Sequence, residues 1–294
     1  MNHLKPLTNF LFSILVAFMS VLTVLPLIFV GIISISSEES ISRKGYSFFP
    51  QQLSLDAYRY LIRSIDSIGR SFLISVVVTV LGTLISLWLI STLAYALSRD
   101  DFMFRRLYTV MILIPMFFGG GLVASYVVNT QVFMLKNTVW ALILPQACGG
   151  WYIIVMRTYF RNNIPSELLD AAKIDGAGTL RIFCEMVIPL SKPIFAAIGL
   201  FEAFSYWNSW YYAMLYLRPE HKGLYPLQYL LYSIQKNVEF MATNDMISGA
   251  LITSMPTEAF RMAIVVVITI PILLTYPLVR KYFIKGMLIG GLKG

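Results

Sequence analysis

The chain has 294 residues, of which 57% are hydrophobic and 13% are charged, and its mean hydropathy is +0.72. Soluble domains carry about a quarter charged residues, so this composition excludes an ordinary soluble domain and predicts an all-α polytopic membrane protein. The net charge of +8 does not indicate nucleic-acid binding, because the Lys and Arg residues stand singly at the ends of apolar runs. The two cysteines, Cys148 and Cys184, have no ligand-like spacing, so no metal site is predicted.

Six segments meet or nearly meet the length of about 20 helical residues that a hydrocarbon core requires. The first is uncharged from Phe10 to Ser34, which is too long for the apolar part of a cleavable signal peptide. Pro115, Pro145, Pro271, Pro277 and a run of three glycines at 119–121 fall inside these segments and predict kinks or close packing. The predicted spans of a single domain covering 1–294 lie near 10–34, 71–98, 107–129, 138–156, 194–217 and 258–280.

Two longer segments, 37–70 and 218–257, separate some of these spans. In the first, Leu53, Leu55, Tyr58, Leu61 and Ile62 follow a helical spacing, which predicts a helix along the membrane surface. The second mixes aromatic, charged and turn-forming residues. Each segment is compatible with docking a partner or with packing on the protein's own bundle.

The positive charges favour one orientation. Six spans place both termini on the same side, and with that side cytoplasmic the four inner segments hold 13 Lys and Arg residues against 10 outside. Positive charge concentrates in short cytoplasmic loops. We therefore expect a multi-pass protein of a bacterial cytoplasmic membrane, with cytoplasmic N- and C-termini and the loop 158–192 in the cytoplasm.

This inner loop contains a stretch with the signals of a short soluble helix. Ser166 follows Pro165 and is a suitable N-cap, and Glu167 and Asp170 place negative charge near the positive end of the helix dipole. Gly176 can adopt the left-handed conformation that ends a helix. We expect a first helix from 166 to about 175, then a second that Thr179 caps and that ends before Pro189.

The first helix has a small and smooth face, formed by Leu168, Ala171, Ala172 and Asp175 at three-and-four spacing. Such a face lets another protein approach the helix backbone, while the flanking carboxylates and Lys173 can pair with charges at the rim of a groove. An isolated helix of about ten residues is marginal in water, so something must hold it. Its own spans could do so as well as a partner.

The stretch from Glu167 to Leu190, ELLDAAKIDGAGTLRIFCEMVIPL, resembles the EAA loop of permease subunits of binding-protein-dependent ABC sugar importers. That pattern reads Glu-Ala-Ala, two residues, Asp-Gly-Ala, and later Ile-x-Leu-Pro. Ala171, Ala172, Asp175, Gly176, Ala177 and Pro189 match it in register, and Asp170, Met186 and Ile188 replace its glutamate, isoleucine and leucine. Six spans with this loop between the fourth and fifth resemble the smaller permease of maltose-type importers, which implies the type I ABC importer permease fold.

The resemblance implies a role for the loop as the coupling helices, seated in a cleft of an ATPase subunit. The residues implied in this coupling are Glu167, Leu168, Asp170, Ala171, Ala172, Asp175, Gly176, Ala177 and Pro189. It also implies the partners: a second, homologous permease, an ABC ATPase dimer that binds ATP and Mg, and an extracytoplasmic substrate-binding protein. The chain has no G-x-x-x-x-G-K-[ST] phosphate loop, so we expect no ATPase site and no cofactor of its own.

The last residues, KYFIKGMLIGGLKG, resemble the ending of permeases for oligosaccharides and polysaccharide fragments. From sequence alone this tail, 281–294, reads as a frayed end. In maltose-type permeases the equivalent tail enters the interface of the ATPase dimer. The resemblance therefore implies an ATPase contact through Gly286, Leu288, Gly290 and Lys293.

The fifth predicted span has unusual chemistry. Glu202 falls well inside it, where a carboxyl group facing lipid is costly, so it should face a cavity or a partner in the bundle. Aromatic rings stack on the apolar faces of sugars, and amide, phenol and carboxylate groups bond to sugar hydroxyls. The predicted substrate path is therefore Glu202, Trp207, Asn208, Trp210 and Tyr211, although Trp and Tyr are also common at membrane interfaces.

The sequence thus favours a permease subunit that forms half of the path for an oligosaccharide. An acidic polysaccharide fragment, such as one of alginate or pectin type, or another solute is the alternative within this class. A self-contained channel or secondary transporter is a rival from another class, and it would be expected to carry paired ionisable residues or an inverted repeat in its spans. A membrane scaffold would leave the coupling-loop match unexplained.

Overall fold

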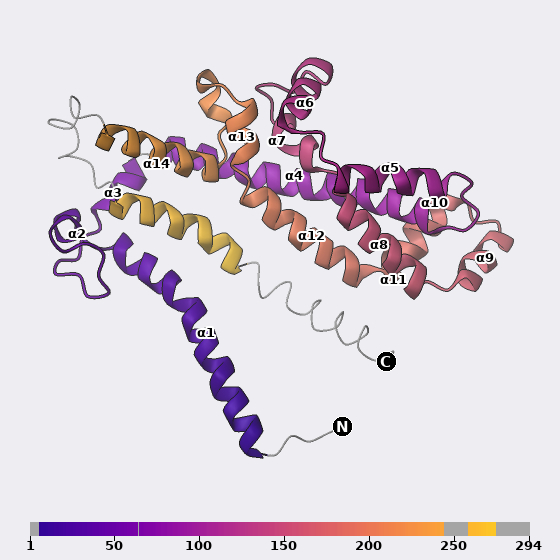
Figure 1. Ribbon diagram of the computed structural model, residues 1–294, viewed down its shortest axis with the longest axis horizontal. Helices are drawn as coiled ribbons and strands as arrows, with labels where there is room; N and C mark the ends of the chain where they lie inside the picture. The colour runs from indigo at the N-terminus through magenta and orange to yellow at the C-terminus, as the bar shows by residue number, and fades with distance from the viewer. Residues whose placement is uncertain (1–5, 64, 244–257, 275–294) are drawn as a thin grey trace. The chain divides into compact units, whose positions relative to one another are not determined.

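The computed structural model describes residues 6–63, 65–243 and 258–274, and it is helical (Figure 1). In the described residues the β-type pairing recorded is a single antiparallel bridge between Ser36 and Leu53. This confirms the all-α prediction. The chain divides into two compact units, Met1–Ile68 with Leu231–Pro271 (unit 1) and Gly69–Leu230 with Ile272–Gly294 (unit 2), which are described separately.

The helices follow one another in this order: α1 Pro6–Ser34, α2 Glu38–Lys44, α3 Asp56–Arg63, α4 Ile65–Ser98, α5 Arg105–Phe117, α6 Leu122–Val127, α7 Trp140–Ile143, α8 Gly150–Asn163, α9 Ser166–Ile174, α10 Thr179–Ile182, α11 Ile188–Leu190, α12 Lys192–Trp207, α13 Tyr211–Tyr216 and α14 Leu227–Thr243. Two π-helical turns, Val128–Val132 and Phe183–Val187, and two 3-10 helices, Leu144–Gln146 and Pro219–Leu224, lie between them. A last helix is described over 258–274.

Unit 1 joins its segments by polar contacts. Glu38 accepts hydrogen bonds from the backbone N–H groups of Glu258 and Ala259 at 3.2 and 3.3 Å, so a carboxylate from α2 caps the helix 258–274. The Tyr58 hydroxyl lies 2.8 Å from Ser34 Oγ, and the Tyr60 ring packs edge-on against Phe260. The aromatic residues of α3 therefore pack on unit 1 itself, and the position of this helix along the membrane surface stays a prediction.

Unit 2 is built around the C-terminal half of α4. A buried apolar cluster joins α4 through Ile90 and Ala94, α8 through Met156, and α12 through Ile198. Val187, from the π-helical turn of the predicted coupling loop, is fully buried in the same cluster. The loop is thus part of the core of unit 2 rather than an appendage to it.

The helices bend more than the sequence predicted. Within the described residues, two helices are long and apolar enough to cross a membrane on their own, Thr8–Ser34 and Asp66–Ser98, and up to four spans result if two bent helix pairs are each counted as one. The first pair, Arg105–Phe117 with Leu122–Val132, bends by 117°. Gly121, at a φ of 82°, supplies the left-handed backbone at this break.

Three predicted spans are therefore not continuous helices. The span predicted at 107–129 is broken at the glycine run, and the one at 138–156 consists of α7, a 3-10 turn that contains Pro145, and the start of α8. The one at 194–217 stops at Trp207 and resumes at Tyr211. Hydropathy measures how apolar a segment is, but it does not show where the backbone hydrogen bonds stop: at a glycine run in the first of these spans, at a proline in the second, and at Asn208 in the third. The sixth predicted span, 258–280, is described as far as residue 274.

Candidate functional site

The predicted coupling loop forms two short helices joined by a glycine turn. The first helix, α9, covers Ser166–Ile174, close to the predicted bounds. Its N-cap is Pro165, without a side-chain capping bond, so the prediction of Ser166 as the cap was wrong. Thr179 is likewise the first residue of α10 rather than its cap, which is Gly178.

The end of α9 has the hydrogen bonds of a Schellman motif. The N–H of Ala177 donates to the Ala172 carbonyl at 2.9 Å, and the N–H of Gly176 donates to the Lys173 carbonyl at 3.0 Å. Gly176 has a φ of 79°, which a residue with a Cβ adopts at a cost. The prediction that Gly176 ends this helix in the left-handed conformation is confirmed, and the motif turns the chain sharply into α10.

One face of α9 packs on unit 2 itself. Ala172 is buried in the apolar cluster that joins α4, α8 and α12, and Leu169 and Ala177 pack against that cluster. This packing holds α9 in place, which matters because a helix this short is not stable on its own in water. Ala172, which the sequence assigned to a face open to a partner, therefore lies on the inner face.

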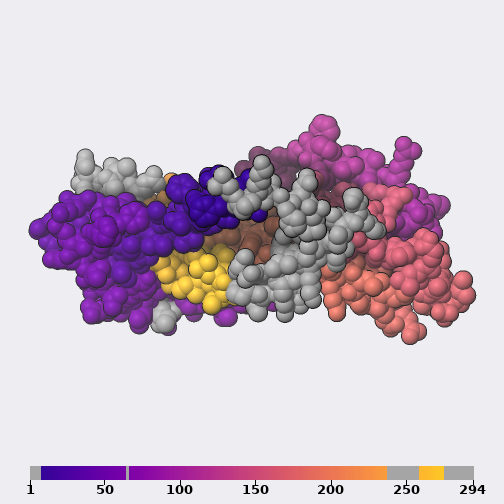
Figure 2. Space-filling model, turned by 90° about the horizontal axis from the view of Figure 1, so that it is seen from below, coloured from indigo at the N-terminus to yellow at the C-terminus, as the bar shows by residue number. Residues whose placement is uncertain are grey.

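The opposite face of α9 and the start of α10 are uncovered. Glu167, Leu168, Asp170, Ala171, Asp175 and Gly176 are all exposed. Two apolar side chains are exposed beside them, Ile174 at 87% and Leu180 at 72%. On the face shown in Figure 2, α9 and its neighbours (pink to salmon, right) form an uncovered end of unit 2.

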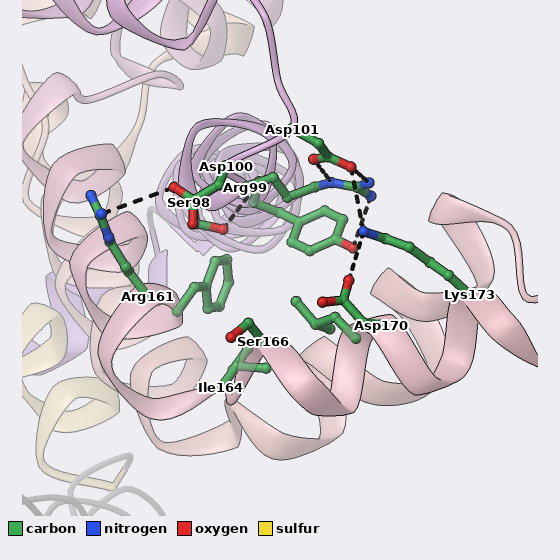
Figure 3. A pocket seen from close by; sticks show the side chains of 12 residues that line it. Ser98, Arg99, Asp100, Asp101, Arg161, Ile164, Ser166, Asp170 and Lys173 are labelled. Atoms are coloured by element: carbon green, nitrogen blue, oxygen red, sulfur yellow. Dashed lines mark hydrogen bonds and ion pairs between the residues drawn. The ribbon is translucent and has the colours of Figure 1, made fainter.

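A network of charges ties α9 to the residues that follow α4 (Figure 3). Arg99 donates two hydrogen bonds to the Asp101 carboxylate, one of them at 2.7 Å. Lys173 stands between two carboxylates, 3.4 Å from Asp101 and 3.0 Å from Asp170. Arg99 also donates to the Thr179 hydroxyl at 3.3 Å. We call Arg99, Asp101, Asp170, Lys173 and Thr179 the latch.

Three groups of the latch, Arg99, Asp101 and Lys173, have pKa values shifted toward their charged forms. Hydrogen bonding from Arg99 holds the pKa of the Asp101 carboxyl well below its usual range, and the same contact raises the pKa of the Arg99 guanidinium. The pKa of Lys173 is raised, chiefly by its hydrogen bond to Asp170. Each of these three shifts favours the charged form, so the ion pairs of Asp101 with Arg99 and Lys173 persist across the pH range of a living cell.

A pocket of about 330 Å³ lies beside the latch. It is enclosed by the end of α4, the end of α8 and the start of α9, and both acidic and basic side chains line it (Figure 3). On its far side Asp100 pairs with Arg105 and lies 3.9 Å from Arg161. The loop after α4 is thus tied both to α9 and to the helices α5 and α8.

Beyond α10 the helical run continues through Pro189, where the sequence predicted a stop. The π-helical turn Phe183–Val187 shifts the hydrogen-bond register ahead of Pro189, which lies within α11 and is exposed. The missing N–H of Pro189 is then no obstacle, because the first N–H groups of a new helical turn have no partner within that turn. The run ends at Ser191, where the chain turns by 83° into α12.

The structure separates the residues of the predicted substrate path into two groups. Glu202 and Trp207 are buried, and the Trp207 ring packs edge-on against Phe72. Asn208, Trp210 and Tyr211 lie at the break between α12 and α13 and are exposed. The predicted tail contacts, Gly286, Leu288, Gly290 and Lys293, lie outside the described residues.

Sequence reasoning missed both the latch and the two exposed apolar residues. Asp101 and Lys173 are 72 positions apart, and no local spacing relates them. One signal was available, since the acid–base group Arg99, Asp100 and Asp101 directly follows the second span and the predicted topology puts it on the same side as the loop. Ile174 and Leu180 flank the glycine turn but lie outside the matched pattern.

Comparison with known proteins agrees with this architecture. Residues 89–289 match the family described as binding-protein-dependent transport system inner membrane component. The chain is 41% identical over 275 residues to the polygalacturonan/rhamnogalacturonan transport system permease protein YtcP of Bacillus subtilis (strain 168), covering 94% of each protein. It is 35% identical to protein LplC of the same organism, covering 93% of this chain and 90% of LplC.

A solved structure shares the fold. The crystal structure of a bacterial ABC transporter involved in the import of the acidic polysaccharide alginate contains a chain that matches with a TM-score of 0.80 and 29% identity. The match covers 96% of this chain and 100% of that one. With the helical architecture described above, these similarities show that the chain belongs to the family of binding-protein-dependent transport system inner membrane components and is a permease subunit of an ABC importer with the type I fold.

Proposed function

We propose that this chain forms half of the translocation path for an oligosaccharide in an ATP-driven importer. The names of its relatives support a carbohydrate substrate, since they include permeases for polygalacturonan and rhamnogalacturonan, arabinooligosaccharides and galactooligosaccharides. The path lies between this subunit and a second, homologous permease. An extracytoplasmic binding protein delivers the sugar, and an ATPase dimer that holds ATP and Mg drives the cycle.

The ATPase contact is the uncovered face of α9, and the exposed pair Ile174 and Leu180 is the observation that carries it. Large apolar side chains exposed this far, next to a charged helix, are typical of a surface that a partner covers. The inner face of α9 is packed against unit 2. A push on the outer face therefore reaches α4 and α12 directly. With the termini cytoplasmic, this face points toward the ATPase.

The test is ATP hydrolysis by the reconstituted complex, stimulated by sugar and binding protein. Ala171→Asp and Ile174→Asp place charge on the outer face, and we expect stimulation to fall at least tenfold, about 1.4 kcal/mol of coupling, with the permease still assembled. Gln51→Asp, a matched exposed site in unit 1, should leave stimulation unchanged. Full stimulation in both loop variants would show that α9 is a connector and not the coupling element.

An acidic polysaccharide fragment is the second candidate substrate. The observation that favours it is the pair of similarities to a polygalacturonan/rhamnogalacturonan permease and to the alginate importer. Uptake of oligogalacturonides, alginate oligomers and neutral galacto- and arabinooligosaccharides by the same proteoliposomes separates the candidates. Each labelled sugar is tested with an excess of unlabelled sugars of the other class. The class that is taken up, and that reduces uptake of the other, is the substrate class.

We propose further that Asn208, Trp210 and Tyr211 contact the sugar, while Glu202 and Trp207 support them from inside. Their exposure at the break after α12 supports this assignment. Trp210→Ala should raise the sugar concentration needed for half-maximal uptake, because a stacked ring contributes about 0.5–1.5 kcal/mol beyond burial.

The tail residues Gly286, Leu288, Gly290 and Lys293 form a second ATPase contact, and unchanged stimulation after deletion of 288–294 would remove that assignment.

A further inference from the structure

Glu202 is the first link in a buried chain of hydrogen-bonding groups. Its carboxyl group is hydrogen-bonded to Ser86 of α4. Ser86 Oγ lies 2.9 Å from the Tyr206 hydroxyl, which donates to the backbone carbonyl of Ile143 at 3.0 Å. We call these four groups the Glu202 chain, and they join α12 to α4 and to the end of α7.

The whole chain is shielded from solvent. Ser86 and Ile143 are fully buried, Tyr206 nearly so, and Glu202 is 3% exposed. The close fit depends on Gly82, because an added Cβ there would lie 2.6 Å from the Tyr206 ring. An ionised carboxylate in such a place costs several kcal/mol unless a cation pairs with it.

No such cation faces Glu202 in the part of the chain that the structure describes. The groups within its reach are Ser86 of α4, Tyr206 of its own helix, Tyr152 of α8 and Cys148 just before α8. Gly149 also lies next to the carboxyl group, since a Cβ on it would lie 3.8 Å from the Glu202 Oε1 atom. None of these groups carries a positive charge.

The hydrogen count of the chain favours a proton on Glu202. The Ile143 carbonyl can only accept, so the Tyr206 proton is used there. Ser86 then has one proton for two acceptors, the Tyr206 hydroxyl and the Glu202 carboxyl group. If Ser86 donates to Tyr206, the carboxyl group must supply the hydrogen of its own contact with Ser86.

We propose that Glu202 is a neutral carboxylic acid in the working importer and a positioning residue that fixes α12 to α4 and α7. Its mechanical role depends on the proposed function, because α12 follows the coupling loop through the turn at Ser191. A movement that enters at α9 passes into α12, and the Glu202 chain keeps α12 from sliding along α4. Glu202 thus acts through Ser86 and Tyr206 and needs no contact with the sugar.

The first test is an infrared difference spectrum of the assembled complex at neutral pH, wild type minus Glu202→Gln. We expect a band from the C=O stretch of a protonated carboxylic acid, absent from the matched difference for Glu39→Gln, an exposed glutamate of α2. A difference spectrum with carboxylate bands alone would overturn the proposal. This measurement does not involve transport, so its result tests the protonation state of Glu202 independently of the proposed function.

The second test compares uptake by two variants. Glutamine keeps the size of Glu202 and its amide can donate to Ser86, so Glu202→Gln should retain uptake within about twofold at every pH from about 6 to 8. Glu202→Leu cannot donate, and we expect it to hydrolyse more ATP per sugar imported although it still assembles. Loss of more than about tenfold in Glu202→Gln uptake, or equal coupling in both variants, would contradict the positioning role.

Discussion

At the scale of single residues, Gly176 does two things for the coupling loop. Its left-handed backbone lets the Schellman motif form, and it turns the chain so that Ile174 and Leu180 are both exposed, one on each side of the turn. Two residues further on, Gly178 has an ordinary extended conformation. Both glycines have open space where a Cβ would be.

The same substitution is expected to lower activity at Gly176 and to have no effect at Gly178. Gly176→Ala forces an alanine into the left-handed region at a cost of about 1–2 kcal/mol, which should loosen the end of α9 and lower sugar-stimulated ATP hydrolysis severalfold. Gly178→Ala adds the same methyl group without that cost and should be neutral. Equal activities of the two variants would show that the turn tolerates other geometries.

The latch gives a second prediction at this scale. Asp101→Asn removes the carboxylate that both Arg99 and Lys173 share, and it leaves the largely buried Arg99 side chain without its charged partner. We expect stimulation of ATP hydrolysis to fall about threefold to tenfold, and to fall no further when Lys173→Ala is added. Removal of the exposed pair Arg43 and Glu39 in unit 1 serves as the control and should have no effect.

The latch also predicts a pH dependence of stability. The pKa of Asp101 is depressed by Arg99 in the folded protein, so its stabilisation is complete above the unfolded value of about 3.9 and is lost as the pH falls toward the folded value. The difference in unfolding temperature between wild type and Asp101→Asn should be constant above about pH 5 and shrink below about pH 4. A difference that varies between pH 6 and 8 would contradict this assignment.

At the scale of elements, the sequence was informative where a local signal acts alone. The proline before α9, the acidic residue in its first turn and the glycine after it are local, and the predicted helix agrees with Ser166–Ile174. The prolines and glycines within the spans predicted breaks, but not a bend of 117°. That angle depends on which neighbours pack against each half of the helix, and no local signal encodes them.

The same distinction applies to the site. The resemblance identified α9, whereas its division into an inner face with Leu169 and Ala172 and an outer face with Leu168 and Ala171 required the core of unit 2. A helical wheel places Leu168 and Ala172 side by side, and only the packed neighbours separate them. The latch and the Glu202 chain join segments far apart in sequence, so neither has a local signature.

Orientation is a prediction about the elements, and accessibility of single cysteines tests it. With Cys148 and Cys184 replaced by alanine, Asn163→Cys at the exposed end of α8 should react with a membrane-impermeant maleimide only in inside-out vesicles. Arg43→Cys at the exposed end of α2 should react in intact cells. The reverse pattern would place the coupling loop outside the cell and exclude contact with a cytoplasmic ATPase.

At the scale of the molecule, unit 2 holds every described residue assigned to coupling. The similarities to a polygalacturonan/rhamnogalacturonan permease and to a chain of the alginate importer each cover nearly the whole chain, and so both units. The composition alone excluded a soluble protein, and the loop pattern alone led to the family. The substrate is a property of the whole path, of which this chain forms one half under the proposed function.

Two of the attachments described above involve α4 and the residues directly after it. Ser86 lies within α4 and attaches α12, and Arg99 lies just past the end of α4 and attaches the loop through the latch. The turn at Ser191 joins the loop to α12, so α4, the loop and α12 form the three sides of a triangle. A frame with three fixed corners cannot shear, and it transfers a push at one corner as rotation of the whole. Opening any one corner would leave a hinge, and under the proposed function ATP hydrolysis would then bend the loop instead of turning the helices attached to it.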